Sequence, residues 1–197
     1  MSTFLKLESW PVTVRFVETG THLRVSVRAA LELGYREVYS IEISDEFFGK
    51  ARLAFQNDLR VRLFHGSSPN LLPQVVAPDV PTTLWLDAHY LGTTLPSHDP
   101  MFGQCPLLAE LAIIAEFPWR VRPLIAIDDA FLFEPATWEG ACPDLFNPDG
   151  MIQADWPTRG QVEQALPGYA FEFDGIRLYC TPLSIRPTST GELLSLG

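Results

Sequence analysis

Residues 14–21 have the sequence Val-Arg-Phe-Val-Glu-Thr-Gly-Thr, a short apolar run that meets an acidic residue and then a glycine turn. Apolar residues at helical spacing follow over 22–33, and Gly34 is typical of the end of a helix. This succession predicts a strand, a tight turn and a helix. Since a second apolar run follows at 37–43, the segment is a βαβ unit, which is characteristic of a parallel sheet.

The same alternation continues to the end of the chain. Further strands are predicted at 60–64, 82–86, 123–127, 169–173 and 176–181. Helices are predicted after Ser44, which can cap one, and at 69–76, 106–117 and 158–166. The 106–117 segment is nearly all apolar and is therefore expected to be buried. Asp174-Gly175 predicts a two-residue hairpin, so the last two strands should be antiparallel.

The composition favours a folded globular protein. Of the 197 residues, 47% are hydrophobic and 19% are charged, which predicts a single domain over 1–197 rather than a disordered chain. The net charge of −10 argues against a nucleic-acid partner, because phosphate binding needs a basic surface. No apolar run approaches the roughly 20 residues of a membrane span. The first ten residues lack the apolar segment of a signal peptide, and the three cysteines are widely spaced, so we expect a cytoplasmic protein with reduced thiols.

Polar residues at the ends of the first strands suggest a nucleoside site. Gly20 permits a tight turn and close approach of a ligand, and Glu18 and Thr21 flank it. Glu42 ends the second strand, where an acidic residue can accept hydrogen bonds from ribose hydroxyls. An ordinary turn and a solvated strand end would explain the same residues. Ser67-Ser68 could contact an adenine ring, although capping of the next helix is the simpler interpretation.

Acidic residues also end the fourth and fifth strands. Asp87 and His89 follow one strand, and Asp128-Asp129 follow the other. Carboxylates gathered in one crevice repel each other unless a cation lies between them, so Asp87, Asp128 and Asp129 predict a divalent metal site. Mg²⁺ is the first candidate, while His89 as a ligand would favour Mn²⁺ or Fe²⁺. His89 could instead be a general base, or these residues could simply cap and order the loops.

Together these residues resemble class I S-adenosylmethionine-dependent methyltransferases, over most of the stretch from Phe16 to Thr181. The 18–21 segment is similar to the family's first, cofactor-binding motif, and Glu42 matches the acidic residue that holds the ribose. The 66–68 segment is similar to a family Gly-Asp-Ser, with Ser67 in place of the acid. The resemblance implies a Rossmann-like fold with strand order 3-2-1-4-5-7-6, helices on both faces and an antiparallel C-terminal hairpin. It also implies S-adenosylmethionine as cofactor, bound by Glu18, Gly20, Thr21, Glu42, Ser67 and Ser68.

Within that class, Asp87, Asp128 and Asp129 resemble the metal ligands of Mg²⁺-dependent O-methyltransferases of the macrocin and catechol types. The strings Trp-Leu-Asp-Ala-His-Tyr at 85–90 and Ile-Asp-Asp-Ala at 127–130 also resemble uncharacterised bacterial proteins of this fold. One departure is that the first motif usually has a second glycine two to four positions on, where this chain has His22, Leu23 and Arg24. An arginine at this position could bind a carboxylate or phosphate group.

Three functions are compatible with the sequence. The first is an enzyme, a metal-assisted methyltransferase that acts on a hydroxyl of a small molecule, sugar or natural product, with Asp87 and His89 as catalytic residues. The second is a metal-dependent oxygenase or hydrolase without S-adenosylmethionine. The third is a degenerate binding module that uses the aromatic loop insertion at about 130–157, and a homodimer is left open. In the first case that insertion would act as a lid.

Overall fold

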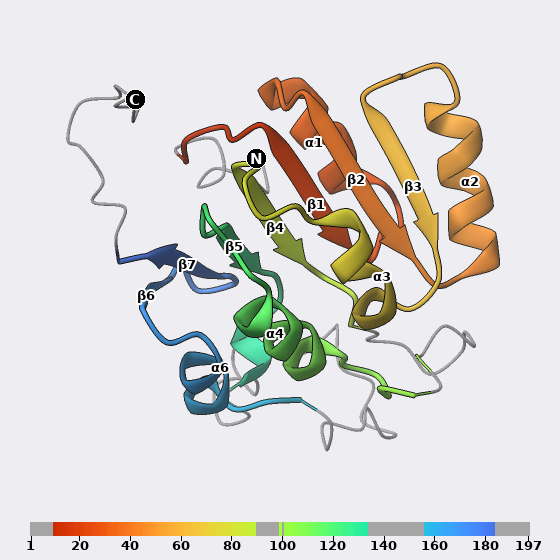
Figure 1. The fold of residues 1–197 in the computed structure, drawn as a ribbon. Helices are drawn as coiled ribbons and strands as arrows, with labels where there is room; N and C mark the ends of the chain where they lie inside the picture. Colours follow the sequence, from red (N-terminus) through yellow and green to blue (C-terminus); the bar gives the residue numbers. More distant parts are fainter. Residues whose placement is uncertain (1–9, 90–98, 100, 134–155, 184–197) are drawn as a thin grey trace, which may run out of the picture.

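The structure is a computed structural model that describes residues 10–89, 99, 101–133 and 156–183. Its strands form one seven-stranded sheet in the order β3-β2-β1-β4-β5-β7-β6 (Figure 1). The strands are β1 (Arg15–Thr19), β2 (Glu37–Glu42), β3 (Val61–His65), β4 (Thr82–Leu86), β5 (Leu124–Ile127), β6 (Tyr169–Phe173) and β7 (Leu178–Pro182). The first five are parallel, and β7 is antiparallel to both β5 and β6. The expected Rossmann-like fold and strand order are confirmed.

Helices cover both faces of the sheet. They are α1 (Val25–Leu33), α2 (Asp45–Phe55), α3 (Ser68–Val75), α4 (Leu107–Glu116) and α6 (Arg159–Ala165), with a short 3-10 helix η2 (Ala130–Phe133). Buried side chains of α3, α4 and α6 pack in the larger apolar cluster, on the near face in Figure 1. Buried side chains of α1 pack in the second cluster, on the other face, and Phe55 at the end of α2 contacts the same cluster.

Helix starts follow the capping signals in the sequence. The Ser44 hydroxyl accepts a hydrogen bond from the Phe47 N–H at 3.4 Å, and α2 begins at the next residue. Thr158 and Gln161 form a reciprocal capping box at the start of α6. Helix α1 instead begins only at Val25, because residues 22–24 form a turn. The prediction of a helix from residue 22 was therefore wrong by about one turn.

Two further sequence predictions need correction. Helix α4 is not buried on all sides: Leu108 is 37% exposed, while Glu110 is almost completely buried. The hairpin loop lies one residue later than expected, since Phe173 pairs with Leu178 and the Asp174 N–H donates to the Arg177 carbonyl at 3.1 Å. Its two central residues are 175 and 176. The strand predicted to begin at 176 begins at Leu178.

Most of the predicted insertion at about 130–157, and with it the predicted lid and most of its aromatic residues, falls outside the described residues. Only η2 at its start and residues 156–157 at its end are described. Within the described ranges, no helix has the length and apolar character needed to cross a membrane.

Candidate functional site

Gly20 sits where the β1–α1 turn approaches the end of β4. Its φ is +84°, and a Cβ on it would lie 2.2 Å from the carbonyl oxygen of Asp87. Its N–H donates to the Ile41 carbonyl at 2.9 Å, which ties the turn to β2. Glycine is therefore required here both for its backbone angle and for the close contact between the two chain segments.

The residues that replace the expected second glycine keep a glycine-like backbone. His22 and Arg24 have φ values of 36° and 67°, in the left-handed region. This conformation costs a non-glycine residue about 1–2 kcal/mol. The Glu42 carboxylate holds the turn by accepting the N–H of His22 and the N–H of Ser44, each at 2.8 Å. Each oxygen retains a second lone pair, so the predicted bond to a ribose hydroxyl stays compatible with this geometry.

Glu18 is fully buried at the end of β1. Its Oε2 accepts the Ser40 hydroxyl at 2.5 Å, and Ser40 is in turn 2.5 Å from the Thr21 hydroxyl. Oε1 of Glu18 is buried and has no hydrogen-bond partner among the described residues. Burial raises the pKa of Glu18 well above its usual value, with the nearby carboxyl of Asp87 acting in the same direction. A buried carboxyl with a raised pKa and one oxygen without a described partner therefore lies at the end of β1.

Ser67 and Ser68 follow β3 at the same edge of the sheet. Ser67 is the N-cap residue of α3, as the capping interpretation predicts, but its hydroxyl makes no capping hydrogen bond. The Oγ atom is buried and has no hydrogen-bond partner within the described part of the chain. Ser68 is buried against the Glu110 carboxyl of α4, and burial raises the pKa of Glu110 to about 7. Oε1 of Glu110 is a second buried oxygen for which the described ranges contain no hydrogen-bond partner.

Three side chains converge beyond β4 and β5. The Nε2 of His89 lies 2.9 Å from Oδ2 of Asp129 and 3.4 Å from Oδ1 of Asp87. One ligand atom from each residue can be chosen so that all three lie within 4.8 Å of one another. The His89 ring also packs on Trp156, with ring centroids 4.7 Å apart. Two carboxylates and one imidazole at this spacing are a donor set that fits a divalent cation.

The protonation of this cluster depends on the carboxylates around it. Burial alone would lower the pKa of His89, but its hydrogen bond to Asp129 and the charge of Asp87 raise it to about 9. Burial raises the pKa of Asp87 to about 8, against the opposing effect of His89. At neutral pH, His89 therefore carries a proton and cannot accept another. In this protonated form His89 can donate a hydrogen bond to a substrate but cannot act as the predicted general base, and it would have to release its proton to ligate a metal.

Asp128 faces a different partner from its neighbour. Its Oδ1 lies 2.9 Å from Nε of Arg177, and both side chains are largely buried. Burial raises the pKa of Asp128, and Arg177 opposes this shift. Oδ1 also accepts the N–H of Asp129 at 3.0 Å. The sequence predicts Asp87, Asp128 and Asp129 as the metal ligands. In the structure, the group that could hold a metal is Asp87, His89 and Asp129, without Asp128.

Sequence reasoning missed three residues of the site: Ser40, Glu110 and Arg177. Glu110 is the acidic residue that interrupts the apolar run 107–115, and a charge on the buried face of a helix is a detectable signal. Arg177 immediately precedes the apolar strand β7 and had no comparable signal. Ser40 could have been found from the register, because it lies opposite Glu18 in the β1–β2 ladder.

No protein-family model matches the chain, and no curated protein matches it. Solved structures do share its fold. The SAH-bound methyltransferase PaMTH1 of Podospora anserina gives a TM-score of 0.60 at 17% identity, over 92% of this chain and 79% of that one. A putative caffeoyl-CoA O-methyltransferase from Staphylococcus aureus gives 0.55 at 12% identity, over 90% and 79% of the two chains. An S-adenosylmethionine-dependent methyltransferase from Mesorhizobium loti gives 0.54 at 16% identity, over 91% and 96%. The chain therefore has the Rossmann-like fold of class I methyltransferases.

Proposed function

We propose that this chain is an S-adenosylmethionine-dependent methyltransferase that acts, with a divalent metal, on a hydroxyl group of a small molecule. The observation that carries the proposal is a set of buried polar atoms near the carboxyl ends of the strands that have no hydrogen-bond partner among the described residues. Oε1 of Glu18, Oγ of Ser67 and Oε1 of Glu110 are in this set. Unsatisfied buried polar groups are costly, so such a group of atoms indicates a site that a polar ligand completes.

The nucleoside part of the cofactor would be held by residues from β1, β2 and α3. Glu42 would accept a ribose hydroxyl with the lone pairs that its two amide contacts leave free. Gly20 and Thr21 would present the turn backbone, while Ser67 and Ser68 would lie near the base. Oε1 of Glu18, which has no hydrogen-bond partner among the described residues, would form a hydrogen bond to the amino-acid part. Ligands bind at this edge of the sheet in open α/β folds.

The hydroxyl substrate would be activated at the Asp87, His89 and Asp129 cluster. A bound metal supplies Lewis-acid chemistry, which lowers the pKa of a coordinated hydroxyl. S-adenosylmethionine would supply the methyl group to the hydroxyl oxygen held at this cluster, leaving S-adenosylhomocysteine. The Oδ1 of Asp129, the oxygen opposite the one that contacts His89, would take the released proton. The remaining work of the protein is alignment, which contributes much of the rate in such reactions.

One observation favours a second candidate. The Asp87, His89 and Asp129 cluster could hold a metal for an oxygenase or hydrolase reaction without S-adenosylmethionine, although the usual oxygenase set has two imidazoles and one carboxylate. The two candidates differ in whether S-adenosylmethionine binds at all. A degenerate binding module is a weaker proposal, because the 22–24 turn keeps the backbone of a glycine-rich loop despite its bulky side chains.

The direct test is transfer of a labelled methyl group from S-adenosylmethionine to a panel of catechols, sugars and aliphatic alcohols, with Mg²⁺ or Mn²⁺ present. We expect a labelled product from at least one acceptor and its loss in Asp87→Asn. Asp79→Asn, which changes an exposed carboxylate away from the site, serves as the matched control. Metal binding without binding of S-adenosylmethionine would instead support the oxygenase or hydrolase alternative.

A further inference from the structure

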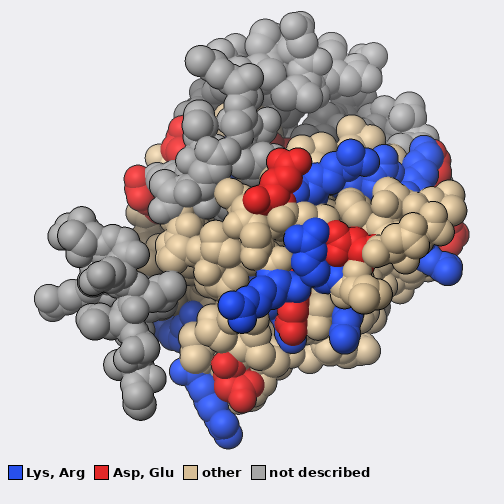
Figure 2. All heavy atoms as spheres, turned by 90° about the horizontal axis from the view of Figure 1, so that it is seen from above, with Lys and Arg blue, Asp and Glu red and all other residues tan. Residues whose placement is uncertain are grey.

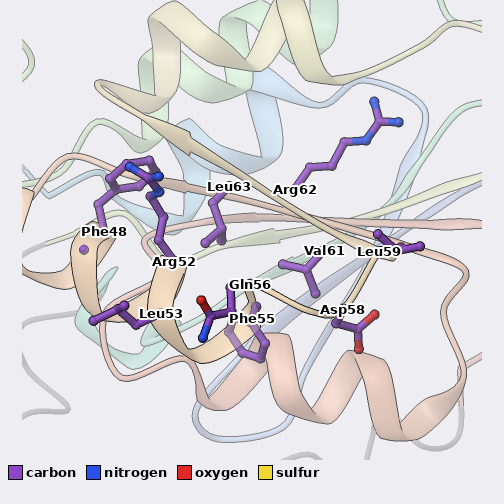
Figure 3. A pocket seen from close by; sticks show the side chains of 11 residues that line it. Phe48, Arg52, Leu53, Phe55, Gln56, Asp58, Leu59, Val61, Arg62 and Leu63 are labelled. Atoms are coloured by element: carbon purple, nitrogen blue, oxygen red, sulfur yellow. The ribbon is translucent and has the colours of Figure 1, made fainter.

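A hollow of about 790 Å³ lies between α2 and β3, away from the candidate active site. Figure 3 shows its lining: Phe48, Arg52, Leu53 and Phe55 from α2, Gln56, Asp58 and Leu59 from the segment that follows, and Val61, Arg62 and Leu63 from β3. Apolar side chains in this region are unusually open to solvent, with Leu53 at 71% and Leu59 at 97% exposure. Nothing in the proposed methyl transfer uses this groove.

The groove reaches the free edge of the sheet. Strand β3 is the last strand on its side of the sheet. Successive side chains of a strand point to opposite faces, and Figure 3 shows Val61 on the α2 side of the strand and Arg62 on the other. Three consecutive residues, Val61, Arg62 and Leu63, nevertheless line the hollow. This requires the hollow to contact the backbone edge as well as one face of the strand.

The register shows which backbone groups point outward. The Val38 N–H donates to the Arg60 carbonyl and the Gly66 N–H donates to the Glu42 carbonyl, both at 2.9 Å. With this hydrogen-bond pattern in a parallel ladder, the backbone N–H and C=O groups of the even-numbered residues of β3 point toward β2. The N–H and C=O of Leu63 and His65 therefore face away from the sheet. An unpaired edge of this kind is a template for an added strand.

The charge beside this edge is opposite in sign to that of the chain. Residues 1–62 contain nine of the 14 Lys and Arg but only eight of the 24 Asp and Glu. Most of the blue spheres in Figure 2 lie at its centre and right, the side on which Figure 1 places β2, β3 and α2. In the groove, Asp58 already pairs with Arg60 at 2.7 Å. Arg52 and Arg62 stack on aromatic rings and have no ion-pair partner within the described ranges.

We propose that the groove binds an extended peptide segment of another protein, in which apolar residues alternate with acidic ones. The segment would add to the outer edge of β3 by main-chain hydrogen bonds to Leu63 and His65. Its apolar side chains would lie on the α2 side, against Phe48 and Leu53. Its carboxylates would lie on the opposite face, where Arg62 projects, and cross-strand pairs of opposite charge are favourable there. Binding between an edge strand and an overlying helix is a known form of strand addition.

The test uses a fluorescently labelled six-residue peptide of alternating Glu and Val, with binding measured by anisotropy. We expect saturable binding at least about tenfold tighter than that of an alternating Lys and Val peptide, or of a peptide with three Glu followed by three Val. Arg62→Glu should weaken binding by about tenfold or more, and the exposed Arg120→Glu should leave it unchanged. Amide exchange at Leu63 should slow when the peptide is added.

Several results would overturn the proposal. Equal binding of the three peptides would show that neither charge nor alternation is recognised. Equal binding by wild type and a folded Arg62→Glu would remove the arginine from the site. Absence of binding to the alternating acidic peptide, together with a dimer in sedimentation that Leu53→Asp dissociates, would assign the groove to a second copy of the chain. Melting temperatures of the variants identify any loss that comes from unfolding.

Discussion

Raising the pH from 6 to 7 should strengthen Mn²⁺ binding to this chain by nearly two orders of magnitude. The reason is that Asp87 and His89 both hold a proton in the metal-free site, since their pKa values are raised to about 8 and about 9. A metal ligand must release its proton, so each of these two residues contributes close to a factor of ten per pH unit below its pKa. The dependence should fall to about tenfold per unit between pH 8 and 9 and then disappear.

Isothermal titration of Mn²⁺ over pH 6 to 9 measures this directly. Repeating the titration at pH 7 in two buffers of different ionisation enthalpy gives the number of protons released, which should be close to two per metal. In His89→Gln the side chain cannot hold a proton, so the slope should fall to about tenfold per unit. A single affinity across pH 6 to 8 would refute the reasoning, because it would show that no proton is exchanged for the metal at these residues.

Three other changes test the rest of the site. Gly20→Ala should lower the free energy of unfolding by about 2 kcal/mol or more, because φ is +84° and the new Cβ meets the Asp87 carbonyl. Gly34→Ala has φ +94° but open space around it, so it should lower the free energy of unfolding by only about 1 kcal/mol. Equal melting temperatures of the two variants would contradict this. Glu42→Gln places an amide group against two backbone N–H groups, so it should weaken binding of S-adenosylhomocysteine by about tenfold in calorimetry; unchanged affinity would remove this residue from the nucleoside site. Arg177→Met leaves the buried carboxylate of Asp128 without its cation and should cost about 3 kcal/mol in urea unfolding at pH 8. The loss should shrink as the pH falls and this carboxyl, whose pKa is raised, becomes protonated; a loss independent of pH would argue against the ion pair.

The sheet could be predicted from the sequence because each strand is a short apolar run bounded by turn residues. Helix caps such as Ser44 and Thr158 were equally visible. The start of α1 was not, because His22 and Arg24 have left-handed backbones, and the turn at His22 is held by a distant residue. In particular, the clamp from Glu42 to the His22 N–H joins residues 20 positions apart. No local propensity of residues 22–24 indicates this clamp.

The sequence was sufficient to predict which strand ends carry the polar residues of the candidate site. Asp87 and Asp129 were found because parallel strands bring their carboxyl ends to one edge. Which carboxylate faces which cation was not predictable, since Arg177 comes from the antiparallel hairpin and takes Asp128 as its partner. Asp128 and Asp129 lie in the turn after β5, and Asp129 has a left-handed backbone with φ of 48°, so the conformation of this turn decides which of the two joins the His89 cluster.

The central claim is that the carboxyl ends of β1, β2 and β3 form a nucleoside site that this chain completes with S-adenosylmethionine or its product. Calorimetric titration of the intact chain with S-adenosylhomocysteine tests it most directly, since the product binds without needing an acceptor substrate. We expect one binding site per chain, with affinity at least tenfold weaker for adenosine, which lacks the amino-acid part. Absence of binding at millimolar ligand, with the chain shown to be folded, would contradict the claim.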